Sequence, residues 1–127
     1  MIEQIIRLKE EYNLLEDDFN LEKAREWYRW AIKNGFVELI YEKDKLVGFA
    51  EWITAKEIPK SLDDYPVYPE KGNVLIVGTL IARRPYIMWK LKSRILSKNK
   101  NRTATIWYRK KNNRLAAIRR KKCLNIG

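Results

Sequence analysis

The chain has 127 residues, a formal net charge of +11, one cysteine and no histidine. This length predicts a single domain over residues 1–127 with a core of ordinary size. One cysteine excludes an internal disulfide and a cysteine zinc cluster, and the lack of histidine removes the commonest general base and metal ligand, so no metal site is expected.

Two helices are predicted at the N-terminal end. In residues 1–15 the apolar residues recur at helical spacing, and residues 21–34 form a second helix that Asn20 caps and Gly35 ends. The first stretch carries acidic residues and lacks the apolar core of a signal peptide, and no uncharged run is long enough to span a bilayer. We therefore expect a cytoplasmic protein that makes no membrane contact.

The next segment, "FVELIYEKDKLVGFAEWIT", consists of two β-rich runs around Lys43-Asp44-Lys45 and predicts an antiparallel hairpin. Alternation along the second run places Glu51 on the same face as Phe49 and Ile53. Residues 56–72 hold three of the four prolines and show no periodicity, so they are expected to form a long surface loop.

The most apolar run, "NVLIVGTLIA" over residues 73–82, predicts a central strand. Strict alternation would divide its side chains between two faces, with Val74, Ile76 and Leu80 on one and Leu75, Val77 and Ile81 on the other. Pro85 suits the first turn of a helix over residues 85–98. A strand over residues 102–108 and a short basic helix over residues 112–122, capped by Asn112 or Asn113, complete the chain.

This order of elements resembles the fold of the GNAT family of N-acetyltransferases, entered after its first strand. "VELIYEKDKLVGFAEWI" resembles the second and third strands of that fold, and "NVLIVGTLIARRP" its fourth strand. "ATIWYRKKNNRLAAIRRKK" is similar to the fifth strand and the following helix, with Asn113 and Ala116 at the family's spacing. The resemblance implies an α+β fold with a central, mostly antiparallel sheet flanked by helices. It also implies an acetyl-CoA or other acyl-CoA donor and an amine-bearing acceptor.

The resemblance implies that Ile81, Arg83, Arg84, Tyr86 and Asn113 contact coenzyme A. The family's pyrophosphate loop is rich in glycine, whereas "RRPYIMWK" contains none. Guanidinium forks can bind phosphate oxygens in place of backbone amides. Alternatively, one arginine is exposed to solvent and the other pairs with a carboxylate from the N-terminal part.

Two residues are candidates for catalysis. Glu51 on a central strand could accept a proton from an attacking amine, and Tyr108 at the end of a strand could donate one. The plainer alternatives are a salt bridge or an exposed position for Glu51, and a structural role for Tyr108. Glu38 is a weaker candidate of the same kind as Glu51. The tyrosine that many GNAT members use as general acid would fall near Arg120, so it is missing here.

Charge supports a second hypothesis. Residues 81–127 contain 16 Lys and Arg and no Asp or Glu, interleaved with tyrosine and tryptophan. Such a segment must face water, the acidic first part of the chain, or a polyanion. The chain could therefore be an active acyltransferase, a member that has lost its cofactor, an unrelated α+β fold, or a non-catalytic nucleic-acid-binding protein that uses residues 81–127.

Overall fold

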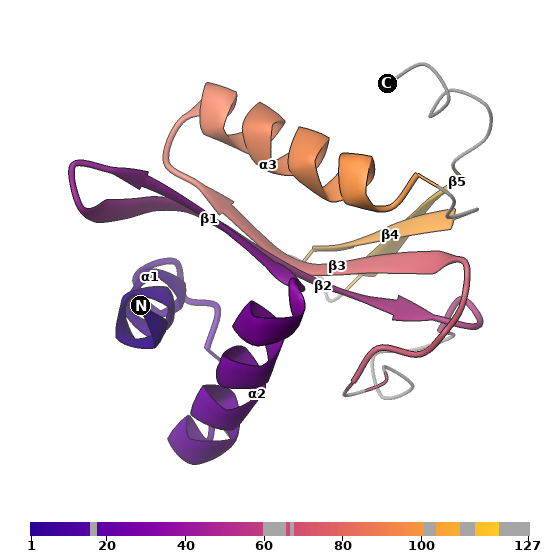
Figure 1. Cartoon of the computed structure of the whole chain (residues 1–127), viewed down its shortest axis with the longest axis horizontal. Coiled ribbons are helices and arrows are strands. Elements are labelled where there is room, and N and C mark those ends of the chain that lie inside the picture. Colours follow the sequence, from indigo (N-terminus) through magenta and orange to yellow (C-terminus); the bar gives the residue numbers. More distant parts are fainter. Residues whose placement is uncertain (16–17, 60–65, 67, 101–103, 110–113, 120–127) are drawn as a thin grey trace.

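The computed structural model describes residues 1–15, 18–59, 66, 68–100, 104–109 and 114–119 (Figure 1). In chain order the elements are α1 (Ile2–Glu11), α2 (Leu21–Asn34), β1 (Val37–Glu42), β2 (Lys45–Ala55), β3 (Val74–Ala82), α3 (Pro85–Lys98), β4 (Ala104–Arg109) and β5 (Arg114–Arg119). No helix in this described part is both long and apolar enough to cross a membrane.

The strands form one five-stranded sheet in the order β1-β2-β3-β4-β5. Every neighbouring pair is antiparallel except β3 and β4, which are parallel. Parallel neighbours need a crossover connection, and α3 supplies it between these two strands. The predicted α+β fold, with a mostly antiparallel sheet flanked by helices, is confirmed.

Local signals fix the ends of several elements as predicted. The side chain of Asn20 accepts a hydrogen bond of 3.0 Å from the Lys23 amide at the start of α2, and Gly35 ends that helix with φ of 80°. Lys43 and Asp44 both have positive φ, at 49° and 66°, which is the backbone that a two-residue hairpin turn requires.

Helix α3 covers one face of the sheet (Figure 1). Its side chains Ile87, Leu91 and Ile95 are fully buried against the sheet, one helical turn apart. Gly48 on β2 makes this close packing possible, because a Cβ at that position would overlap the Cγ2 atom of Ile87. The missing side chain thus sets how near α3 can lie to the sheet.

Helices α1 and α2 lie on the opposite side of the sheet (Figure 1). Their buried residues Ile5, Leu8, Tyr28 and Ala31 form one cluster with Phe49 of β2. Each helix therefore buries one apolar stripe, and the sheet is covered on both faces.

The pairing of β2 with β3 contains a bulge. Glu51 lies opposite Thr79 and Trp52 lies opposite Val77, so Gly78 is an extra residue in β3. A bulge of this kind interrupts the alternation of side chains along a strand.

The bulge overturns one prediction made from strict alternation. Leu80 was expected on the face opposite Leu75 and Val77, and this was wrong, because Leu80 packs with them on the α3 side. Ile81 in turn packs into the cluster beneath α1 and α2, which is not the face of Leu75 and Val77. After the bulge, therefore, each side chain of β3 points to the face of the sheet opposite to the one that strict alternation predicts.

The helix predicted over residues 112–122 was also wrong over the part of that segment that the structure describes, residues 114–119. Residues Arg114–Arg119 form β5, which pairs with β4 in register from Tyr108↔Leu115 to Ala104↔Arg119. A helix this short is marginal without extensive packing, whereas β5 satisfies the backbone groups along the edge of β4. The asparagines that were interpreted as a helix cap are equally typical of turns.

Candidate functional site

Strands β3 and β4 diverge in the middle of the sheet. Their parallel pairing runs from Val74↔Ala104 to Val77↔Trp107 and then stops, although β3 continues to Ala82. The rest of β4 pairs with β5 rather than with β3. Beyond the Gly78 bulge, β3 therefore has no strand on its β4 side in the described part of the chain, and its backbone groups there can pair with a ligand.

A cleft of about 420 Å³ opens at this end of β3. It lies where β3 leads into α3 and faces the segment after α1. The lining residues are Tyr12, Leu14, Leu80, Ile81, Ala82, Arg83, Arg84, Pro85 and Met88. The cleft thus combines apolar walls with two guanidinium groups, and it contains three of the five residues that were predicted to contact coenzyme A.

Both arginines of the cleft pair with carboxylates. Arg83 contacts Glu11 at the end of α1, with 2.6 Å between Nη2 and Oε2. Arg84 pairs with Glu42 at the end of β1. The Nε atom of Arg83 is buried and has no hydrogen-bond partner, so this side chain retains an unused donor.

Tyr86 also belongs to the cluster around Glu42. Its hydroxyl contacts Oε2 of Glu42 and lies 3.3 Å from Nη1 of Arg84. The hydrogen bond from Tyr86, followed by that from Arg84, lowers the pKa of Glu42 below its usual range. Glu42 therefore remains a carboxylate, and it occupies the donors that a bound anion would use.

The first turn of α3 offers few backbone amides to an anion. Pro85 has no N–H, and the amides of Ile87 and Met88 both donate to the carbonyl oxygen of Arg84, at 3.0 and 3.3 Å. This differs from a glycine-rich phosphate loop, in which several amides point at the ligand. An anion at this turn would be held mainly by the arginine side chains.

Glu51 is the centre of a second polar cluster, on the α1–α2 side of the sheet. Its Oε1 atom accepts a hydrogen bond of 2.9 Å from the Thr79 hydroxyl and lies 3.4 Å from Nζ of Lys9. Lys9 also donates to the hydroxyl of Tyr28 at 3.0 Å. The Oε2 atom of Glu51 is buried without a partner, so it is an acceptor that remains available.

Tyr28 stays protonated in this cluster. Burial raises the pKa of its hydroxyl well above the ordinary value, and the neighbouring carboxylate of Glu51 raises it further. Tyr28 therefore contributes a neutral hydroxyl that accepts from Lys9. Glu51 does not line the cleft, but its partner Thr79 directly precedes Leu80, which does.

The remaining candidates are placed less centrally. Glu38 faces the other side of the sheet, where it pairs with Arg94 and Lys98 of α3, and it does not join the cluster around Glu51. Tyr108 lies near the end of β4, beyond the last residue that pairs with β3. Asn113 lies outside the described residues. Among the residues that are described, no three His, Cys, Asp or Glu side chains come together as metal ligands.

Sequence patterns alone missed Lys9, Thr79 and Tyr28. Lys9 and Tyr28 lie on different helices and reach Glu51 only because α1 and α2 pack on the same face of the sheet. Thr79 reaches it only because the Gly78 bulge brings Thr79 opposite Glu51. No spacing in the sequence records either relationship.

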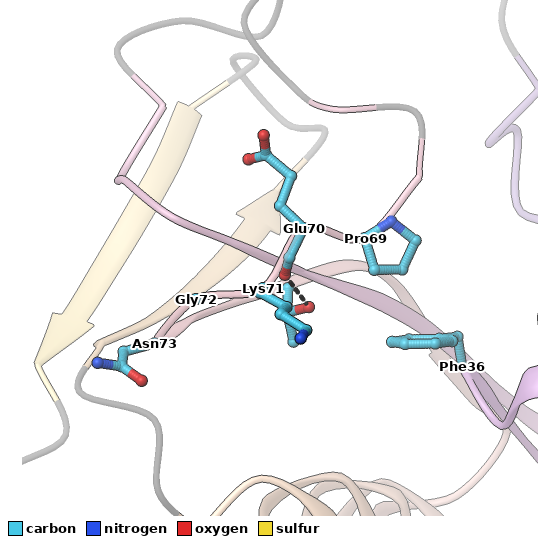
Figure 2. Close-up of a pocket in the computed structure, with 7 residues that line it drawn as sticks. Phe36, Pro69, Glu70, Lys71, Gly72 and Asn73 are labelled. Carbon is cyan, nitrogen blue, oxygen red and sulfur yellow. Dashed lines mark hydrogen bonds between the residues drawn. The ribbon is translucent and has the colours of Figure 1, made fainter.

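A second hollow of about 340 Å³ lies at the opposite end of β3 (Figure 2). Phe36 and the segment from Pro69 to Asn73 line it, together with Thr54, whose hydroxyl donates to the carbonyl oxygen of Glu70 at 2.7 Å. This bond ties the segment to the end of β2. The hollow lies at the other end of β3 from the arginines, and it contains none of the predicted site residues.

Comparison with known proteins supports the assignment of the fold. No protein-family model matches the chain, and a search of curated proteins finds no significant match. Among solved structures, the chain is similar to the crystal structure of the loading GNATL domain of CurA from Lyngbya majuscula, with a TM-score of 0.61 at 14% sequence identity. The similarity covers 84% of this chain but only 59% of that chain. The chain therefore has a divergent GNAT-like fold, and at this identity the likeness concerns the fold alone.

Proposed function

We propose that this protein is an N-acyltransferase that takes an acyl group from an acyl-CoA and transfers it to an amine. The observation that carries the proposal is the arrangement at the end of β3. A cleft with two arginines opens where β3 and β4 diverge, and the carboxylate of Glu51 is held one residue away through Thr79. The acyltransferase-like fold is consistent with this chemistry, but the site and not the fold argues for it.

The residues of the cleft fit a phosphate-bearing thioester. Arg83 and Arg84 would hold the phosphates, since guanidinium groups bind phosphate oxygens in a fork. Their present partners, Glu11 and Glu42, are substantially exposed carboxylates and can be displaced at small cost. The buried and unused Nε of Arg83 is a further donor for the ligand.

The free side of β3 suits the amide-containing arm of coenzyme A. Beyond Gly78 the backbone groups on the β4 side of β3 lack a strand partner, so they can pair with amides in the manner of an added strand. The apolar side chains of Leu80, Ile81 and Met88 would cover the same arm. Phosphates at the arginines and an arm along β3 would direct the acyl group towards Gly78 and Glu51.

An acyl-CoA supplies a thioester. Transfer of its acyl group to an amine forms a C–N bond and breaks a C–S bond, while the amine loses a proton and the departing thiolate gains one to become the thiol. Glu51 Oε2 is the base we assign to the amine proton, because it is a carboxylate oxygen without another partner. Thr79 and Lys9 hold Oε1 and so orient the carboxylate. Tyr108, in β4, is the candidate from the sequence for the residue that protonates the leaving thiolate.

Calorimetry with coenzyme A and acetyl-CoA tests the binding part of this proposal. Wild-type protein should bind both ligands, and the double variant Arg83→Ala/Arg84→Ala should bind at least about tenfold more weakly, because each lost charge-assisted hydrogen bond costs about 1.5–3 kcal/mol. The variant Lys23→Ala/Lys33→Ala removes the same charge from exposed positions of α2 and should bind normally. Unaltered affinity in the arginine variant, or no binding by the wild-type protein, would contradict the proposal.

A thiol-release assay with acetyl-CoA tests the transferase part. Incubation with primary amines such as spermidine, lysine methyl ester and a lysine-containing peptide should release coenzyme A together with an acetylated amine. Mass spectrometry of the amine distinguishes transfer from simple hydrolysis of the thioester. Binding of acetyl-CoA without acetylation of any amine would leave the cleft as a cofactor site and refute the enzymatic activity.

A further inference from the structure

The outer face of α3 carries aromatic rings that the fold does not bury. Trp89 is 66% exposed and Tyr86 is 50% exposed, whereas Trp52 is buried and Trp27 and Trp30 are packed against the core beneath α1 and α2. Aromatic residues are enriched at interaction surfaces relative to the rest of a protein surface. Among the described residues, Trp89 belongs to none of the buried apolar clusters.

Exposed cations accompany these rings at helical spacing. Tyr86, Lys90 and Arg94 recur every four residues, so each lies about 6 Å further along the helix axis than the last. Lys98, one turn later, turns towards the sheet, where its Nζ contacts Glu38 and lies over the ring of Trp52. Lys92 places its Nζ atom 5.7 Å from the ring centroid of Trp89. Helix α3 contains no acidic residue, so no carboxylate of the helix itself neutralises these cations.

The neighbouring edge of the sheet offsets only part of this charge. Glu38 pairs with Arg94 and Lys98, and a single carboxylate cannot neutralise both cations. Glu42 is already paired with Arg84 and with the hydroxyl of Tyr86, and Lys90 acts on it only through its charge. The outer face of α3 therefore keeps an excess of positive charge.

A second line of exposed residues along the helix has small side chains beyond its first member. It starts at Trp89 and continues with Ser93 and Ser97, both exposed. Small hydroxyl side chains allow a ligand backbone to lie close to the helix and can donate hydrogen bonds to it. Trp89 therefore lies at one end of a line of serine hydroxyl groups, and Lys90 and Arg94 lie next to this line.

We propose that the outer face of α3 binds single-stranded nucleic acid, with a base stacked on Trp89 and the phosphates at Lys90, Lys92 and Arg94. Exposed aromatic rings combined with cations are the features that single-strand binders use, since every base offers a ring face and every linkage a negative charge. A duplex fits less well, because its bases are already stacked and offer Trp89 no free face. An acidic protein would use the cations but would gain nothing specific from Trp89. This proposal does not depend on the CoA cleft.

Fluorescence anisotropy with labelled oligo-dT and oligo-U of about twelve nucleotides tests this surface, since single-strand sites span about 4–16 nucleotides. Trp89→Ala should weaken binding about tenfold, because it removes one stacking platform. Lys90→Gln/Lys92→Gln should reduce the slope of log affinity against log salt by about 1.4, since each phosphate contact on a single strand contributes about 0.7. Both changes are at the surface and should leave the circular dichroism unchanged.

The matched control Lys23→Gln/Lys33→Gln removes two exposed charges from α2, on the other side of the sheet, and should leave affinity and salt slope as in the wild type. Three results would overturn the proposal. The first is an equal loss of affinity in this control. The second is displacement of the oligonucleotide by polyglutamate as readily as by unlabelled oligonucleotide. The third is a wild-type dimer in sedimentation velocity that Trp89→Ala converts to monomer, because the face would then be an interface between two copies of the chain.

Discussion

Glu51 lies directly opposite Thr79 in the sheet, and the Thr79 hydroxyl donates a hydrogen bond of 2.9 Å to Oε1 of Glu51. This pairing exists because Gly78 is an extra residue in β3. Without the bulge, a different residue would lie opposite Glu51. The bulge thus couples the position where β3 leaves β4 to the orientation of the carboxylate that we assign as the base.

Replacement of Glu51 with Gln should lower the rate of acetyl transfer by about 10²–10⁴-fold, which is the usual contribution of a general base. Affinity for acetyl-CoA should not change, because Glu51 lies outside the arginine cleft. Thr79→Val keeps the shape of the side chain but removes the hydrogen bond, so it should cause a smaller loss of rate. Steady-state kinetics with calorimetry separates these effects. A normal rate in Glu51→Gln would exclude Glu51 as the base.

Replacement of Gly48 with Ala should destabilise the fold. A Cβ at this position would overlap Cγ2 of Ile87, and overpacking of this kind costs about 1–3 kcal/mol. Gly78→Ala is the matched control, since the nearest atoms to a Cβ there are 4.0 Å away, and its stability should stay within about 0.5 kcal/mol of the wild type. Urea unfolding followed by tryptophan fluorescence measures both, and equal stabilities would show that α3 lies further from β2 than described.

The protein should lose stability in alkali through Tyr28. Burial raises the pKa of Tyr28 in the fold, while in the unfolded chain it titrates near 10. Stability from this group is therefore complete below about pH 10 and is lost as the pH rises beyond that value, because only the unfolded chain ionises readily. The melting temperature of wild-type protein should fall more steeply between about pH 9 and pH 11 than that of Tyr28→Phe. If the melting temperatures of the two proteins fell equally with pH, Tyr28 would not be the cause of the alkaline loss of stability.

Replacement of Glu42 with Gln should strengthen coenzyme A binding, in contrast to the arginine variants. Glu42 occupies donors of Arg84 and Tyr86 and places a negative charge beside the cleft. The neutral amide competes less for Arg84 and does not repel phosphate, so we expect affinity to rise about three- to tenfold, the size of about 0.7–1.4 kcal/mol. Glu22→Gln in the first turn of α2 is the control for charge alone. Weaker binding by Glu42→Gln would mean that Glu42 itself contacts the ligand.

Much of the fold could be predicted from local signals. Asn20 and Gly35 bracket α2, Lys43 and Asp44 form the hairpin turn, and Pro85 opens α3, because each of these residues acts on the backbone within a few positions. The predicted helix at residues 112–122 failed, because the free edge of β4 is a long-range feature that outweighs a short helical pattern. The sequence of residues 114–119 alone does not indicate that an unpaired edge of β4 is available to them.

The candidate site was predictable only in part. The position of Arg83 and Arg84 after an apolar strand and before a proline placed them at a strand-to-helix junction, and the structure puts both in a cleft. Their partners Glu11 and Glu42 lie 72 and 42 positions away in the sequence, which no local pattern indicates. The role of Thr79 depends on a single-residue bulge, and alternation across Gly78 predicted the wrong face for Leu80.

Hydrogen exchange with acetyl-CoA tests the central claim most directly, because it reads the backbone of the cleft itself. Saturating acetyl-CoA should slow the exchange of amides from Gly78 to Met88, where β3 is free of β4 and α3 begins, and should leave amides at Glu70–Asn73 unchanged. The protection should disappear in Arg83→Ala/Arg84→Ala. Protection confined to the hollow at the other end of β3, or no protection at millimolar acetyl-CoA, would contradict an acyl-CoA site at the end of β3.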